Sequence, residues 1–324
     1  MATTTKKSTT RKKPTSSKTS SAKTTKKATS NKVVKAPDTS KTKIESASVS
    51  NAKKDTSVKL PKTPLTKMQK LFKWNITLAG IHALQAVAII LLSKPGLGVQ
   101  PVTTSYLTLD TLASTSEKPV LVSATRFLFN VNLAWFIAAF FIMSALAHLI
   151  IATRYRKTYE ANLTKGMNKA RWIEYSLSAS TMMVAIGFLA GIFDLGTIIA
   201  MFALTAVMNL CGLIMEVSNQ GKEKPNWLSY IVGCIAGIVP WIVFAIYIYG
   251  SRQFSEGGGP PSFVYWILLS IFLIFNSFAY VMYKQYAKKG KWADYLYGEK
   301  VYMILSLLAK TLLAWQVFSG ALRP

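Results

Sequence analysis

The feature that most limits how this sequence can fold is a series of seven long apolar stretches after residue 70. A helix that crosses a membrane needs about 20 mostly apolar residues, because its backbone polar groups must be satisfied within the segment. Gly, Pro and charged residues separate the stretches. The sequence therefore predicts seven transmembrane helices, over residues 71–92, 125–151, 170–192, 195–216, 228–250, 262–283 and 299–319.

The segment before these stretches has the opposite composition. Residues 1–70 hold 19 Lys and Arg against three acidic residues and no aromatic residue. Such a segment cannot bury enough apolar surface to offset its ordering entropy. We therefore expect a disordered, basic tail rich in Lys, Thr and Ser over 1–70, and a membrane domain over 71–320. The tail is either solvated or in contact with anionic lipid or nucleic acid, without sequence preference.

Several protein classes are excluded by the same composition and by missing motifs. The chain is too apolar after residue 70 for a two-domain soluble enzyme, and it has no Walker, HExxH or GxSxG motif. We therefore do not expect an enzyme. The two cysteines, Cys211 and Cys234, lie in apolar stretches without CxxC or Cys/His spacing, so neither a zinc site nor a disulfide framework is expected.

The distribution of charge predicts the orientation. Seven spans place the two termini on opposite sides of the membrane. Loops on the side of the tail carry 13 Lys and Arg, and those on the other side carry five. The positive-inside rule then predicts a cytoplasmic N-terminus and an extracellular C-terminus. The long outer loop, about 93–124, contains β-prone runs at 102–109 and 120–123, which predict a small hairpin.

One lysine lies deep in the last span. Lys310 is about ten residues, or roughly 15 Å, from either end, which is too far for its ammonium to reach the interface. A central Lys costs about 2.5–3.5 kcal/mol on insertion scales, so it must be paired, neutral or covalently converted. Glu174 in the third span is a natural counter-charge, with Arg171 one turn away to help keep it ionised. A purely structural Lys–Glu pair is the alternative.

Other polar residues of the spans fit a cavity near this pair. His82, Gln85 and His148 lie in the first two spans, where they either form a hydrated cavity with Lys310 and Glu174 or bond helices together. Glu216 ends the fourth span and is expected to reach the interface. The interiors of the last three spans contain no Asp or Glu. A relay of carboxylates through the membrane is therefore not predicted.

The sequence closely resembles the heliorhodopsins over about residues 70–320. The resemblance depends on the run Leu305–Phe318 around Lys310, the run Arg171–Ser176 around Glu174, His82 with Gln85, and His148. The expected cytoplasmic N-terminus is similar to this family too. The fold class implied is an all-α, rhodopsin-like bundle of seven transmembrane helices, with the hairpin in its first extracellular loop.

The resemblance also implies a cofactor and its site. Retinal, all-trans in the dark, would be bound to Lys310 as a protonated Schiff base, with Glu174 as counterion and Ser306 beside it. His82, His148 and Gln85 would line the hydrated cavity. The candidates for the wall along the polyene, which core packing would also explain, are Trp172, Tyr175, Met208, Pro240, Trp241 and Phe275.

These features together predict a light-sensing photoreceptor that signals through a photocycle without pumping ions. The resemblance implies a homodimer and a cytoplasmic signalling partner. Two alternatives stay open: a light-gated proton or ion conductor with the same chromophore, and a membrane scaffold without retinal in which the Lys310–Glu174 pair only fixes helix register.

Overall fold

The structure is a computed structural model that describes residues 66–323. The chain divides into two units, Met1–Pro61 and Lys62–Pro324, and the described residues belong to the second. The prediction of a disordered tail over 1–70 falls almost wholly outside the described residues.

Seven helices among residues 66–323 are long and apolar enough to cross a membrane, so the predicted number is confirmed. The chain is a multi-pass membrane protein. The seven helices are α1 (Lys67–Leu92), α2 (Leu133–Ala152), α4 (Lys169–Leu189), α5 (Leu195–Ser218), α6 (Leu228–Phe254), α7 (Ser262–Ala287) and α8 (Tyr295–Val317), the last continued by the short π-helix η2 (Phe318–Leu322).

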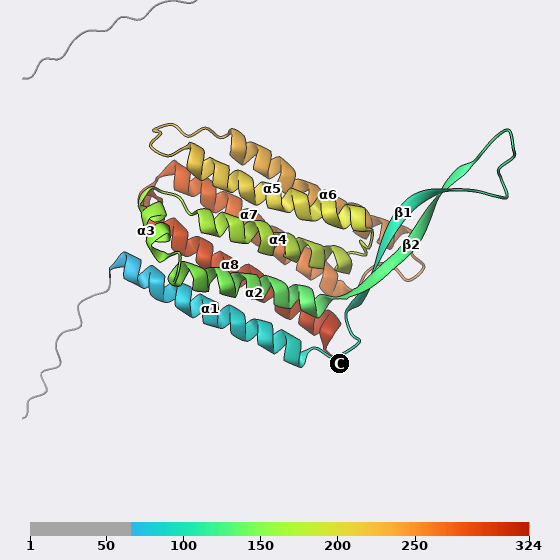
Figure 1. The fold of residues 1–324 in the computed structure, drawn as a ribbon, viewed down its shortest axis with the longest axis horizontal. Helices are drawn as coiled ribbons and strands as arrows, with labels where there is room; N and C mark the ends of the chain where they lie inside the picture. The colour runs from blue at the N-terminus through green and yellow to red at the C-terminus, as the bar shows by residue number, and fades with distance from the viewer. Residues whose placement is uncertain (1–65, 324) are drawn as a thin grey trace, which may run out of the picture. The chain divides into compact units, whose positions relative to one another are not determined.

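The seven helices form one bundle, and α1 begins at the opposite end from where α8 finishes (Figure 1). We call the end where α1 begins the proximal end. It also carries a short helix, α3 (Arg156–Thr164), and the 3-10 turn η1 (Gly290–Ala293). The polar run 153–169 was expected only to break two spans. It is too short and too polar to cross a membrane, but it folds as α3 against the bundle, with Tyr159 and Leu163 buried.

The other end of the bundle, the hairpin end, carries a two-stranded antiparallel sheet (Figure 1). The hairpin prediction is confirmed, but the strands β1 (Val99–Leu109) and β2 (Leu121–Asn132) are longer than expected. The second helix therefore starts at Leu133, and the prediction of a span from 125 was wrong for residues 125–132. This stretch is apolar enough to extend a helix by hydropathy, yet it pairs with β1 residue by residue across one bulge.

Side-chain caps define where five helices begin, and one of them is Asn132, which accepts from the Ala134 backbone at the start of α2. The hydroxyl of Thr66 accepts from the Gln69 backbone in a capping box, which starts α1. Asn168, Asp194 and Asp294 accept from backbone N–H groups in the first turns of α4, α5 and α8. Each cap satisfies a backbone donor that the helix itself leaves unpaired, and so stabilises the start of the helix.

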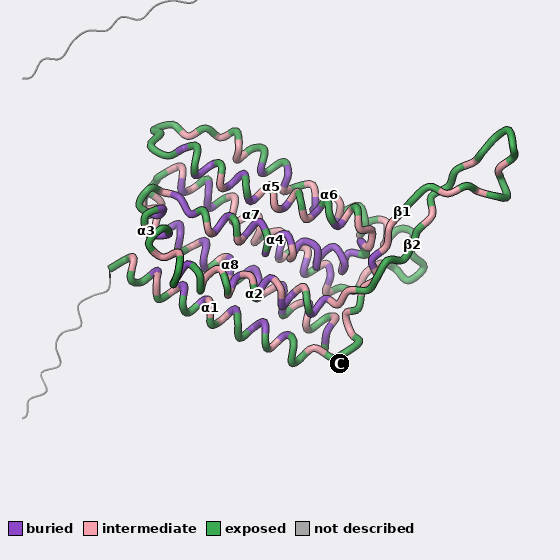
Figure 2. The backbone as a smooth tube through the Cα atoms, viewed as in Figure 1, coloured by how far each residue is buried: buried purple, intermediate pink, exposed green. Residues whose placement is uncertain are grey.

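The half of the bundle toward the hairpin end is filled by apolar side chains. Leu133, Ile137, Phe140, Leu313 and Val317 are fully buried there. Figure 2 shows buried stretches concentrated on α4, while α6 is largely exposed or intermediate. The exposed faces of the helices carry many Leu, Ile and Val side chains, as expected of a bundle whose surroundings are lipid.

Candidate functional site

The site begins with two charged groups brought together from α8 and α4. Lys310 Nζ lies 3.3 Å from Glu174 Oε1, and both side chains are buried, at 3% and 9% exposure. Lys310 Nζ also donates to Ser306 Oγ at 2.8 Å, one helical turn earlier on the same face. Ser144 of α2 donates to Glu174 Oε1 at 2.6 Å. The predicted placement of Lys310, Glu174 and Ser306 beside one another agrees with these distances.

A cavity adjoins the Lys310 amine, and a second cavity continues from it. Tyr175, Met208 and Phe275 line the first together with Ser306 and Lys310. Met208 and Phe275 also line the second, where Trp172 joins them. Four of the six residues predicted as the polyene wall thus lie on these cavities. Wall residues that the sequence did not single out are Ala179, Met182, Asn209, Phe278 and Ala309.

The other two predicted wall residues lie elsewhere. Trp241 does not line either cavity, but packs edge-on against Phe275 with ring centroids 5.9 Å apart. Pro240 is buried inside α6 and also lines neither cavity. Trp241 also packs against Phe244 of its own helix and against Phe272 of α7.

The two histidines stack on each other next to Glu174. Their rings are 5.8 Å apart and nearly parallel, at 7°. His148 Nδ1 lies 2.8 Å from Asn75 Oδ1, and His82 is fully buried without a hydrogen-bond partner among residues 66–323. Sequence reasoning missed Asn75, although it precedes His82 by two helical turns on the same face of α1.

Gln85 lies apart from the two histidines, although it was predicted to line a hydrated cavity with them. Its Oε1 accepts from Trp315 Nε1 at 3.3 Å, closer to the hairpin end. The residue lies one turn beyond His82 along α1, nearer to Trp315. It joins two helices instead.

A second buried cluster lies between this pair and the proximal end. Arg171 of α4 forms ion pairs with both Glu216 of α5 and Glu299 of α8. Tyr159 donates to Glu299 at 3.1 Å and Tyr295 donates to Glu216 at 2.9 Å. Burial raises the pKa of the Tyr159 hydroxyl well above its ordinary value, so it stays a donor.

This cluster adds to one prediction and corrects another. Arg171, expected to help keep Glu174 ionised, forms its ion pairs with Glu216 and Glu299. Glu216 is 2% exposed instead of reaching the interface, because Arg171 compensates its charge inside the bundle. Glu299 was missed at the very start of the predicted last span. Its distance of eleven residues from Lys310, three helical turns, was the available signal.

A small cavity connects the two clusters. It is lined by His148 and Glu174 on one side and by Arg171, Glu299 and Asn168 on the other. The cavity is lined by enough polar groups to hold water. The polar part of the bundle therefore extends from Lys310 toward the proximal end, while the side toward the hairpin is apolar.

The residues around Lys310 fit a long, apolar aldehyde. A primary amine that is buried opposite a carboxylate is the group that forms a Schiff base with such a molecule. The cavities beyond it have the apolar and aromatic walls that a polyene requires. A buried amine on the last of seven transmembrane helices, facing a carboxylate on the third, is the arrangement of a retinal-binding photoreceptor.

A comparison with protein families agrees with this class. The family model described as Heliorhodopsin matches residues 71–322, and the chain belongs to the heliorhodopsin family. This family consists of non-enzymatic light receptors that carry retinal. Among solved structures, the chain is similar to a light-driven proton pump, LR (Mac), from Leptosphaeria maculans, at 15% identity over 79% of this chain and 95% of that chain, with a TM-score of 0.46. A comparison with curated proteins gives no match.

Proposed function

We propose that this protein is a light sensor that signals through a photocycle without pumping ions. The observation that carries the proposal is the buried Lys310–Glu174 pair, with 3.3 Å between Nζ and Oε1. Retinal, all-trans in the dark and joined to Lys310 as a protonated Schiff base, would supply absorption of visible light and isomerisation. Glu174 is then the counterion, and Ser306 lies beside the nitrogen.

The surrounding residues offer a place for a proton that leaves this nitrogen. Asn75 Oδ1 can only accept, so His148 Nδ1 carries the hydrogen of their 2.8 Å bond. His148 Nε2 is then an acceptor in the neutral ring, and it belongs to a side chain on the cavity that Glu174 also lines. His82, stacked behind His148, has two unbonded ring nitrogens within the described part of the chain. We infer that this pair of histidines holds the proton during the photocycle.

The test is a visible spectrum after all-trans retinal is added to the purified protein. We expect a band in the visible that hydroxylamine bleaches, and we expect Lys310→Ala to lose it. Lys300→Ala is the matched control, because Lys300 lies on the same helix but is exposed. A visible pigment in Lys310→Ala would refute the attachment, and a wild-type protein without any pigment would favour the scaffold without retinal.

A second candidate function, a light-gated proton conductor, is favoured by one observation. The cavity shared by Glu174 and Glu299 connects the Lys310 site to a cluster of polar side chains that reaches the proximal end through Glu216. The described residues on the hairpin side of Lys310 offer an apolar core instead. The polar route is therefore half of a conduction path.

Illuminated liposomes distinguish the two functions. Sustained acidification or alkalinisation that Glu299→Gln abolishes would establish conduction. A pigment that cycles under the same light without any sustained change in pH would support the sensor. Glu160→Gln is the control, because it neutralises a half-exposed carboxylate of α3 that pairs with Arg156.

A further inference from the structure

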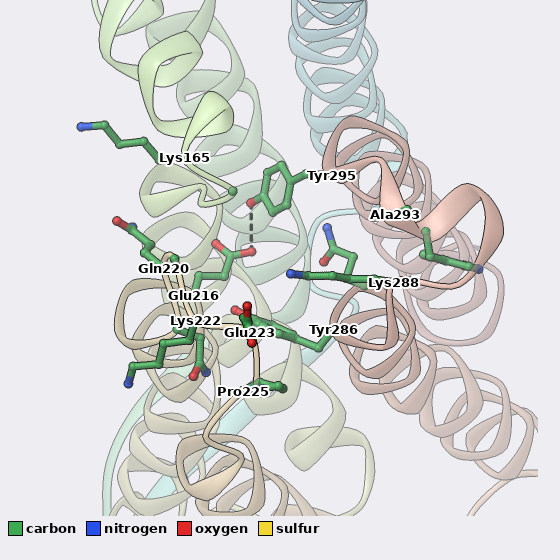
Figure 3. A pocket seen from close by; sticks show the side chains of 15 residues that line it. Lys165, Glu216, Gln220, Lys222, Glu223, Pro225, Tyr286, Lys288, Ala293 and Tyr295 are labelled. Atoms are coloured by element: carbon green, nitrogen blue, oxygen red, sulfur yellow. Dashed lines mark hydrogen bonds between the residues drawn. The ribbon is translucent and has the colours of Figure 1, made fainter.

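A cavity at the proximal end is separate from the Lys310 site. It opens between the segment that joins α3 to α4, the segment that joins α5 to α6, and the end of α7 with η1 (Figure 3). We call it the proximal pocket. Its lining includes Lys165, Glu216, Lys222, Gln285 and Lys288. The proposed light sensing uses neither Gln285 nor Lys288 of this lining.

The floor of the proximal pocket is a carboxylate whose bonding capacity is already used. Glu216 accepts from Tyr295 Oη at 2.9 Å, which Figure 3 shows, and from the backbone N–H of Asn168 at 2.8 Å. Arg171 forms an ion pair with it from behind. The floor therefore has little capacity left to bind a cationic ligand.

A buried donor of the pocket is left without a partner. Gln285 is 8% exposed, and its Nε2 has no hydrogen-bond acceptor among residues 66–323. The amide is held in place because its side chain packs against Gly298 of α8, where a Cβ would overlap it. Burying an amide donor without a partner costs about 1–3 kcal/mol. Gln285 lines the pocket, so a small rotation of its amide would let an acceptor oxygen of a ligand pair with Nε2 and remove this cost.

A lysine with a left-handed backbone conformation lies one turn after Gln285, at the end of α7. Lys288 caps α7 with φ of 51°, and it is the one non-glycine residue with a positive φ in the described part of the chain. This left-handed conformation costs roughly 1–2 kcal/mol for a residue with a Cβ, and glycine usually takes the position. Figure 3 shows the Lys288 side chain extending toward the middle of the pocket.

The rim of the pocket adds positive charge. Lys165 and Lys222 lie there with their side chains extending outward (Figure 3), and with Lys288 they outnumber the lining carboxylates Glu216 and Glu223. Free donors and an excess of positive charge select a negatively charged ligand. Tyr286 and Trp292 also line the pocket, so the ligand can carry an apolar or flat part next to its charge.

We propose that the proximal pocket binds a small oxyanion, a phosphate or carboxylate group, between the Gln285 amide and the Lys288 ammonium. The anion is either free in solution or the headgroup of an anionic lipid at the membrane surface. The site is distinct from the Lys310 site, because its ligand groups lie on the far side of the Arg171 cluster.

The test is calorimetric titration of inorganic phosphate into the full chain in a nonionic detergent, with and without retinal. We expect saturable binding, weakened about tenfold by Gln285→Leu, which corresponds to about 1.4 kcal/mol. Lys288→Gly should weaken binding similarly while leaving the protein at least as stable, because glycine accepts the left-handed backbone. That second variant separates loss of the site from loss of folding.

Two neighbouring lysines outside the lining provide matched controls. Lys224→Gln and Lys289→Gln remove the same charge from exposed positions beside Lys222 and Lys288. Affinity within about twofold of the wild type is expected for both, a change near 0.4 kcal/mol. Absence of saturable phosphate binding in the wild type, or an equal loss in the controls, would overturn the proposal. Since the titration does not need retinal, a missing pigment would leave its result intact.

A comparison of lipids identifies the source of the anion. The same titration is made in nanodiscs of zwitterionic lipid and in nanodiscs that contain an anionic phospholipid. Weaker phosphate binding in the anionic discs, with Lys288→Gly removing the difference, assigns the site to a lipid headgroup. Equal binding in both discs assigns it to a free anion.

Discussion

At the scale of single residues, the chemistry of this protein depends on how few partners Lys310 and Glu174 have. Lys310 contacts Glu174 and Ser306, and Glu174 also accepts from Ser144. A unit charge about 4 Å away contributes about 4 kcal/mol at an effective dielectric constant near 20. The charged form of the nitrogen therefore depends mainly on one carboxylate.

Glu174→Gln tests this dependence directly. The neutral amide cannot compensate a proton on the buried nitrogen, so we expect the pigment to absorb in the near ultraviolet at pH 7 instead of the visible. Absorption spectroscopy after addition of retinal measures the change. Glu160→Gln, at a half-exposed site, should keep the visible band. An unchanged spectrum in Glu174→Gln would show that another group serves as counterion.

The Arg171 cluster makes a prediction about stability. Arg171→Leu leaves the carboxylates of Glu216 and Glu299 buried without their cation, which we expect to cost about 3–5 kcal/mol. Arg156→Leu removes an arginine from a half-exposed pair with Glu160 and should cost less than about 1 kcal/mol. Unfolding by SDS in mixed micelles measures both. Similar losses in the two variants would contradict the role assigned to burial.

At the scale of elements, Asp194 joins the hairpin to the bundle. Its carboxylate caps α5 by accepting from the Thr197 backbone at 2.8 Å, and it also accepts from the backbone of Ser105 in β1 at 3.3 Å. These bonds, the one from Thr197 above all, lower the pKa of Asp194 below its ordinary value. A lowered carboxyl pKa stabilises the folded state above the ordinary pKa, and this contribution is lost as pH falls through the lowered value.

Asp194→Ala should therefore destabilise the protein by about 1 kcal/mol at pH 7, as loss of a helix cap usually does. Asp194→Asn should keep most of the cap but lose the dependence on pH. Unfolding measured between about pH 3 and pH 7 compares the three proteins, since an unperturbed Asp titrates near pH 3.9. A wild type and an Asn variant with the same pH profile would contradict the assignment to the Asp194 carboxylate.

The elements also show where hydropathy stops being informative. Residues 125–132 are apolar enough to be taken as the start of a helix, and only the pairing of β2 with β1 reveals a strand. The polar segment 153–169 gave no sign of α3, because Tyr159 and Leu163 become buried only when α3 packs on the bundle. Local sequence therefore predicts how many spans there are better than where each one begins.

At the scale of the whole molecule, every candidate site residue lies in the unit Lys62–Pro324. Deletion of residues 1–61 should therefore leave the visible pigment unchanged, whereas it should weaken attachment to anionic vesicles. Each Lys or Arg near an anionic surface contributes about 1 kcal/mol, and salt screens this beyond about 10 Å at 0.1 M. Co-flotation of full-length and shortened protein in nanodiscs with anionic vesicles measures it. Equal flotation at low salt would favour the solvated tail over contact with anionic lipid.

The homodimer, the cytoplasmic signalling partner and the orientation of the termini stay predictions. The hairpin carries exposed apolar side chains, among them Leu107, Leu112 and Phe127, which are a suitable surface for a second copy. Light scattering in detergent is expected to give the mass of two chains. Replacement of Leu107 and Phe127 by Ser should shift the protein toward the mass of one chain, and an unchanged dimer would place the contact elsewhere.

The sequence alone determined that this is a membrane protein with seven spans and a buried lysine, because these signals are local: apolar stretches long enough to span a membrane, and one lysine too deep to reach the interface. It also singled out Glu174 as the partner of Lys310. Only the tertiary structure decided that Arg171 belongs to Glu216 and Glu299, that Gln85 bonds Trp315, and that Gln285 and Lys288 face a pocket. Pairing between side chains far apart in the chain depends on the tilt and rotation of packed helices, which local patterns do not specify.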